Sequence, residues 1–253
     1  MHIRPVLAGL LVLAAAACAE RPAHPARAPL PACEPARYAR EAYPPSSSQR
    51  ESLILLAVQE WVWFDRQEID FTGPSAELRH AGVREDGSSG AAIRADAPER
   101  VAAYWRATGY PQRNGRDGIP WSAAFISWLF INAGVPTSIF CPDQGHAVYV
   151  ERLVERARQP GALLLPRRLS QRTPQPGDLI CAAREQSGLS LDNLNRGAGH
   201  CDLVVERRAD AVLAIGGNVT DSVTRSIFPL DSSGHLVPVS ARPFFTVIEN
   251  DLP

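Results

Sequence analysis

The sequence predicts one α+β domain in which helices come first and an antiparallel sheet follows. Apolar residues recur at helical spacing between residues 50 and 157. After Pro166, short apolar or alternating runs are separated by turn residues, as in a series of antiparallel strands. The chain has 253 residues, of which 45% are hydrophobic, so it is long enough to bury one sizeable core. We therefore expect residues 49–253 to form a single domain.

The elements follow from these patterns and from their end signals. Helices are expected over residues 50–64, 96–109, 122–133 and 147–157. Asp96 can cap the second helix, with Glu99 at the capping-box position, and Gly134 ends the third. Strands are expected over residues 177–183, 201–206, 211–215, 222–227 and 244–248.

The N-terminus resembles a bacterial lipoprotein signal. Residues 1–17 contain Arg4, a short apolar run and then small residues, and they end before Cys18. We expect residues 1–17 to be cleaved and Cys18 to carry a lipid. Proline is frequent in residues 18–48, which predicts an extended tether to the membrane. Ala19 stands where an Asp would retain a lipoprotein at the inner membrane, which favours the periplasmic face of the outer membrane.

Four cysteines remain after Cys18, and an oxidising compartment would allow two disulfides among them. Three pairings are open in principle. Cys181 and Cys201 both lie in predicted strands and could face each other, which would leave Cys33 to pair with Cys141.

Composition and charge narrow the classes of function. The net charge of −1 provides no electrostatic basis for binding nucleic acid. All 26 basic residues are Arg, because the sequence contains no Lys, and this excludes Schiff-base chemistry and lysine bases. A mixed zinc site of Cys141, His146, His200 and Cys201 is an alternative, but its spacing is irregular. We therefore expect no metal and no cofactor.

Ser122 lies where a loop with several turn signals enters an apolar helix, in the segment Ile119–Trp128. The first N–H groups of a helix have no intrahelical acceptor and, with the helix dipole, favour negative charge. A serine here can be a nucleophile beside an oxyanion site. It can equally be an ordinary N-cap, which stabilises a helix by about 1 kcal/mol.

Two later segments supply partners for Ser122. His200 begins a predicted strand, and Asn218 follows Gly216 and Gly217 at the end of the next strand. Neighbouring antiparallel strands would place His200 and Asn218 side by side, and a helix packed on the sheet would bring Ser122 to the histidine. This arrangement predicts Ser122 as nucleophile, His200 as base and Asn218 as the group that orients the base.

Three further residues are candidates for the same cleft. By strand alternation Asp202 shares a face with His200, so it rivals Asn218 as the orienting group, or it is a substrate-binding or solvated charge. His146 and Trp121 are candidate substrate-binding residues. Simpler interpretations also exist: His146 as the start of a helix, Trp121 as part of the core, and Asn218, named above, as a turn residue with positive φ.

The order of these segments resembles the papain-like cell-wall hydrolases of the NlpC and CHAP type. Those enzymes have a nucleophilic cysteine at the start of a helix and then strands that carry a histidine and a polar third residue. Pro176–Ile180 and Gly199-His200 are similar to their Pro-Gly-Asp-Leu turn and Gly-His strand start, and the resemblance covers roughly residues 100–220. More narrowly, the segments around Ser122, His200 and Asn218 resemble a bacterial family known as domain of unknown function 2272.

The resemblance implies a papain-like domain and an envelope hydrolase that cleaves amide bonds in peptidoglycan peptides. The departure is Ser122, which stands where the enzymes have cysteine. A hydroxyl is much harder to deprotonate than a thiol and needs a well-aligned base and an oxyanion site. Two alternatives stay open: an inactive module that binds peptidoglycan or an envelope peptide, and a purely structural envelope lipoprotein.

Overall fold

The computed structural model describes residues 29–34, 38, 41, 48–88, 94–184 and 186–253, and its compact unit comprises Pro31–Pro253. The expected signal peptide (residues 1–17) and the expected lipidation site, Cys18, lie outside the described residues. No helix in the described ranges is long and apolar enough to cross a membrane.

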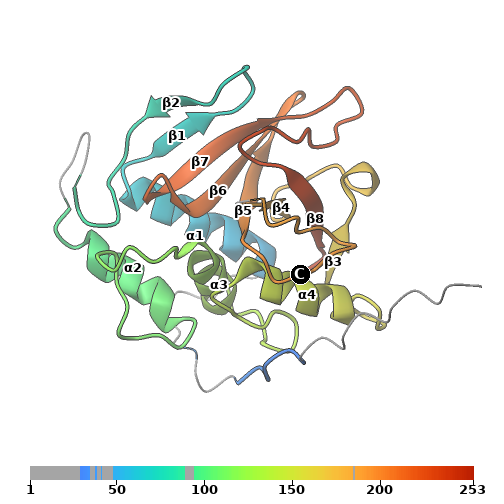
Figure 1. Ribbon diagram of the computed structural model, residues 1–253, viewed down its shortest axis with the longest axis horizontal. Helices are drawn as coiled ribbons and strands as arrows, with labels where there is room; N and C mark the ends of the chain where they lie inside the picture. The colour runs from blue at the N-terminus through green and yellow to red at the C-terminus, as the bar shows by residue number, and fades with distance from the viewer. Residues whose placement is uncertain (1–28, 35–37, 39–40, 42–47, 89–93, 185) are drawn as a thin grey trace, which may run out of the picture. The chain divides into compact units, whose positions relative to one another are not determined.

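The described part of the chain is α+β, with the helices before most of the strands (Figure 1). The helices are α1 (Gln49–Trp63), α2 (Ala97–Arg106), α3 (Ser122–Asn132) and α4 (His146–Arg156). The strands are β1 (Gln67–Asp70), β2 (Glu77–His80), β3 (Leu164–Arg167), β4 (Leu179–Ala183), β5 (Gly199–Arg207), β6 (Ala211–Val219), β7 (Ser222–Pro229) and β8 (Phe244–Asn250). All four expected helices and all five expected strands are present, with shifted ends. The capping bond expected at Asp96 is not formed, although α2 begins directly after it.

The strands form one eight-stranded sheet in the order β2-β1-β7-β6-β5-β4-β8-β3. The sheet is mixed, whereas the sequence predicted an antiparallel one, because β1 pairs with β7 in parallel. A parallel pair needs a long connection instead of a hairpin, and β1 meets this condition because residues 71–221 connect it to β7. The sequence patterns also missed β1, β2 and β3. Their residues are largely polar or, in β3, interrupted by Pro166, which is tolerated because β3 lies at the sheet edge.

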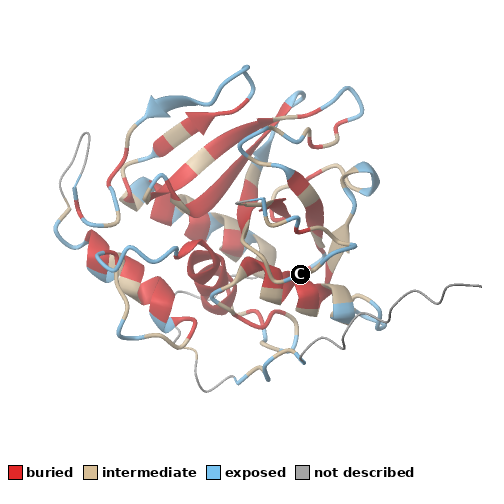
Figure 2. Ribbon diagram, viewed as in Figure 1, coloured by how far each residue is buried: buried red, intermediate tan, exposed pale blue. Residues whose placement is uncertain are grey.

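The main core lies between the helices and one face of the sheet. All eleven residues of α3 are buried, so this helix runs through the interior beneath the sheet (Figures 1 and 2). A helix that is apolar on every side requires such surroundings. A second cluster, which includes Ile180, Val204 and Phe228, packs separately from the first. The buried α3 thereby presents its N-terminus to the strands in the middle of the sheet.

Two disulfides join segments that are distant in the sequence. Cys33 is bonded to Cys141, and Cys181 on β4 is bonded to its cross-strand partner Cys201 on β5. This is the pairing that the sequence favoured among the three. The backbone N–H of Glu41 also donates to the side chain of Asn132. The described residues from Pro31 onward therefore belong to the compact unit, so the fold begins earlier than the expected boundary at residue 49.

Removal of the Cys33–Cys141 disulfide is expected to destabilise the domain strongly. The bond closes a loop with a sequence separation of 108 residues, for which the chain-entropy model predicts a loss of about 4–5 kcal/mol. Urea unfolding of the Cys33→Ser/Cys141→Ser variant, followed by tryptophan fluorescence, measures this loss. An unfolding free energy within about 0.5 kcal/mol of wild type would show that this disulfide does not stabilise the folded domain.

Candidate active site

Ser122 is the first residue of α3 but not its cap. Trp121 occupies the N-cap position and makes no side-chain capping bond. The Ser122 hydroxyl instead lies between two imidazoles: its Oγ is 2.7 Å from Nδ1 of His200 and 2.8 Å from Nε2 of His146. The N-cap interpretation of Ser122 is therefore wrong, and its hydroxyl is hydrogen-bonded to two histidines instead.

His200 and Asp202 form a pair on β5. Alternate residues of a strand face the same side, so the two side chains are neighbours, and Nε2 of His200 lies 2.8 Å from Oδ1 of Asp202. Both are buried. Burial by itself would raise the pKa of Asp202, but the adjacent His200 and Arg242 outweigh it and lower that pKa. Asp202 is therefore a carboxylate at neutral pH and accepts the Nε2–H of His200.

This one assignment sets the direction of every other hydrogen bond in the cluster. With its proton on Nε2, a neutral His200 has a free lone pair on Nδ1, so the Ser122 hydroxyl donates to it. Ser122 Oγ then accepts the Nε2–H of His146, and Nδ1 of His146 accepts from the hydroxyl of Tyr149. The result is a single directed chain from Tyr149 to Asp202.

Burial keeps both histidines neutral, as this chain of hydrogen bonds requires, and nearby positive charges add to its effect. Burial is the largest cause that lowers the pKa of His200, and Asp202 opposes the shift only in part. Burial also places the pKa of His146 well below the ordinary value of 6.5, and the nearby His200, Arg184 and Arg242 add to this effect. At neutral pH His200 can therefore accept the proton of Ser122.

Two adjacent glycines on β6 leave room for the cluster. A Cβ on Gly216 would lie 1.9 Å from Oδ1 of Asp202 and 2.9 Å from Nε2 of His200. A Cβ on Gly217 would lie 2.5 Å from Cβ of Phe125 and 2.6 Å from the Trp121 ring. All four distances are shorter than a Cβ atom tolerates, so Gly216 gives space to the His–Asp pair and Gly217 lets α3 approach the sheet.

Asn218 is directed away from the position expected for it. Its φ of +57° is left-handed, as a turn residue requires, and its Nδ2 donates to Oε2 of Glu85 at 2.8 Å. The Trp121 indole N–H donates to the same carboxylate oxygen. Burial raises the pKa of Glu85. Asp202, the rival candidate, occupies the orienting position that Asn218 was expected to fill, and Glu85 is a residue that the sequence patterns missed.

Trp121 is part of the core and not of the cleft. Its ring is buried and packs against Phe64 and Tyr104. His146, in contrast, reaches Ser122 because the loop before α4 is hydrogen-bonded to α3, which holds the start of α4 near Ser122. Within that loop, the backbone N–H of Asp143 donates to the Ser127 hydroxyl at 3.1 Å.

Arg242 is a further charged neighbour that the sequence analysis did not identify. Its Nε lies 4.0 Å from Oδ2 of Asp202, which is an ion-pair distance too long for a hydrogen bond. Both atoms are buried, and neither has a hydrogen-bond partner among the described residues. Burial lowers the pKa of Arg242, against the opposite effect of Asp202. Its position beside the carboxylate explains in part why Asp202 remains ionised.

A cavity of about 320 Å³ opens onto Ser122 and His146. Its wall also includes Pro120, Gly145, Arg184 and Arg196. Ser122 is only 2% exposed, so the hydroxyl lies at the inner end of this cavity. A zinc site of Cys141, His146, His200 and Cys201 is incompatible with the structure, because both cysteines are held in disulfides and cannot act as thiolate ligands.

Comparison with known proteins adds a family. A family model described as "Uncharacterized protein conserved in bacteria (DUF2272)" matches residues 87–246, a range that includes Ser122, His146, His200 and Asp202. No curated protein and no solved structure matches the chain.

Proposed function

The chain belongs to DUF2272, a family of uncharacterized bacterial proteins, so its function has to be inferred from the site, and we propose that it is a serine amidase or peptidase. One observation carries the proposal: Ser122 Oγ, His200 and Asp202 are linked by bonds of 2.7 and 2.8 Å. These are the contacts that nucleophile, base and orienting group require of one another. A helix cap or a structural histidine does not need a buried carboxylate behind it.

In the proposed reaction, Ser122 Oγ attacks the carbonyl carbon of an amide while His200 Nδ1 takes the hydroxyl proton. The carbonyl π electrons move to its oxygen. When the tetrahedral intermediate collapses, the C–N bond breaks and His200 returns the proton to the leaving amine. Water then attacks the acyl-serine with His200 again as base, which releases a carboxylic acid and restores Ser122. Asp202 stabilises the imidazolium at each step.

Donors for the developing negative charge come from two elements. The first backbone N–H groups of α3 have no acceptor within the helix, and the helix dipole adds to their effect. His146 donates its Nε2–H to Ser122 Oγ in the resting state. This bond favours charge on the hydroxyl oxygen as the proton leaves. This hydrogen bond matters more for a serine than for a cysteine, because a hydroxyl is harder to deprotonate than a thiol.

For the fold and the substrate, the proposal follows the resemblance of the sequence to NlpC/CHAP-type papain-like hydrolases. The substrate would be an amide bond in peptidoglycan peptides. The signal-like residues 1–17 and Cys18 support a lipoprotein, with the catalytic domain in the periplasm and the lipid in the outer membrane. The disulfides agree with this compartment, because such bonds persist where the environment is oxidising.

The test is digestion of purified peptidoglycan followed by mass spectrometry of the released fragments. Wild type is expected to release peptides, Ser122→Ala to release none, and Ser122→Cys to retain activity because His200 can deprotonate a thiol more easily. If neither wild type nor Ser122→Cys changes the fragments, the catalytic proposal fails. Binding of the same fragments by Ser122→Ala would then identify a binding module instead.

The activity is expected to be lost at acidic pH, but only at a lower pH than for an enzyme whose histidine base has the ordinary pKa. His200 must be neutral to accept the Ser122 proton, and burial lowers its pKa below the ordinary 6.5. Activity is therefore present above this lowered pKa and falls as the pH drops through it. The acidic limb of kcat/KM should have its midpoint below pH 6.5. A midpoint above pH 6.5 would contradict a buried His200 as the base.

A further inference from the structure

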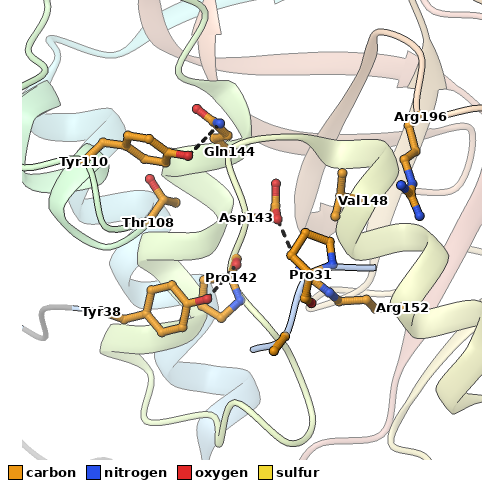
Figure 3. A pocket seen from close by; sticks show the side chains of 11 residues that line it. Pro31, Tyr38, Thr108, Tyr110, Pro142, Asp143, Gln144, Val148, Arg152 and Arg196 are labelled. Atoms are coloured by element: carbon orange, nitrogen blue, oxygen red, sulfur yellow. Dashed lines mark hydrogen bonds and ion pairs between the residues drawn. The ribbon is translucent and has the colours of Figure 1, made fainter. Parts of the chain in front are cut away.

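The cavity at Ser122 is the middle one of three adjoining cavities. It shares Gln144 and Arg196 with a cavity of about 300 Å³, whose lining side chains are shown in Figure 3. Through a different residue, Arg184, it adjoins a cavity of about 590 Å³. Volumes of about 300–1,000 Å³ are typical of ligand sites. A chain molecule whose central bond lies at Ser122 would thus have space on both sides.

The two outer cavities differ in charge. In the smaller one, the cations already have acidic partners: Arg152 lies 3.2 Å from Asp143, and Arg196 lies 2.8 Å from Glu151. Tyr110 and Gln144, which are hydrogen-bonded to each other, add neutral polar groups there (Figure 3). This side is suited to an uncharged part of a peptide.

In the larger cavity, the charged residues of the described wall are Arg184 and Arg242. Arg242 is mostly buried and faces Asp202. Arg184 is half-buried, and within the described ranges its guanidinium forms no hydrogen bond or ion pair. Its charge also acts on the centre of the site, since it lowers the pKa of His146 and of His200. A half-buried guanidinium with no partner among the described residues is suited to bind an oxyanion, because it has donor pairs that match the geometry of a carboxylate.

We propose that the substrate is a peptide that lies across the three cavities and places a carboxylate against Arg184, next to the bond that Ser122 attacks. The inference rests on the proposed function and adds its specificity: an acidic peptide, bound on one side of the scissile bond through a charge and on the other through neutral contacts. Arg184 is a binding residue in this scheme and takes no part in proton transfer.

The test measures binding, so that it does not depend on turnover. Ser122→Ala is titrated with soluble peptidoglycan stem peptides whose glutamate carboxylate is free, and with the same peptides in which that carboxylate is amidated. Free-carboxylate peptides are expected to bind about tenfold more tightly, in line with a hydrogen bond to a charged group. Adding Arg184→Gln should abolish the difference, and Arg184→Lys should restore part of it. The control is Arg158→Gln, an exposed arginine after α4, which should leave the difference unchanged.

The outcomes separate the two proposals. Equal binding of both peptide forms, or a preference that persists in Arg184→Gln, overturns the carboxylate site. If wild type still cleaves peptidoglycan in that case, the proposed catalytic function stands. If neither form binds, this inference is also overturned, and the digestion experiment alone decides whether the enzyme acts on peptidoglycan.

Discussion

Asp202→Asn is expected to reduce kcat by about 10³–10⁴-fold while the fold is retained. The amide can present its NH₂ to Nε2 of His200, which forces the proton onto Nδ1. The imidazole then has no lone pair for Ser122, whose Oγ lies 2.7 Å from that nitrogen. Steady-state kinetics on released peptides measure the loss, and circular dichroism confirms that the variant is folded.

A second readout distinguishes an orienting carboxylate from a structural one. The charge of Asp202 raises the pKa of His200, so its removal should lower that pKa further and move the acidic limb of the residual activity to lower pH. The matched control is Asp192→Asn, at an exposed ion pair with Arg168 that should be worth little. Asp202→Asn with wild-type kcat would exclude Asp202 from the mechanism and reopen the role of Asn218.

Gly216→Ala is expected to have the second largest effect. Its Cβ would lie 1.9 Å from Oδ1 of Asp202, so either the carboxylate or the strand has to move. A displacement of about 1 Å at a catalytic group commonly costs about 10²-fold in rate. The same clash should destabilise the domain by about 1–3 kcal/mol. Urea unfolding and peptide release measured on the same preparation give both quantities.

Two other glycines serve as comparisons. Gly217→Ala clashes with Phe125 and Trp121 instead, so it should reduce stability without direct contact with the Asp202 carboxylate. Gly73→Ala meets its nearest atom at 3.7 Å and should be neutral in both measurements. If Gly216→Ala were as active as Gly73→Ala, the tight packing against the carboxylate would have no role in catalysis.

The sequence predicted Ser122 and His200 as partners because each lies at the start of a strongly patterned element. Strand alternation also put Asp202 on the same face as His200, but it could not decide between Asp202 and Asn218. That choice depends on the path of β6, where Asn218 adopts a left-handed turn and binds Glu85. Glu85 lies in an irregular segment without periodicity, so no sequence pattern marked it. The pair Gly216-Gly217 does mark this part of β6 in the sequence, because adjacent glycines in a strand indicate that other groups approach its backbone closely.

The fold was predictable where apolar periodicity was strong and not elsewhere. The apolar segments that became α3, β5 and β6 were identified, whereas β1 was missed because three of its four residues are polar. The parallel pairing of β1 with β7 depends on contacts between segments more than 150 residues apart, which local patterns do not contain.

The disulfide between Cys181 and Cys201 has a consequence for the strands that it joins. Cys201 is the residue between His200 and Asp202, and its cross-strand partner is the other half of the bond. A slip of one residue between β4 and β5 would turn both functional side chains to the opposite face of the sheet. The covalent link prevents that slip. It therefore fixes the register of β4 and β5 and keeps the two side chains on the same face for as long as the disulfide is intact.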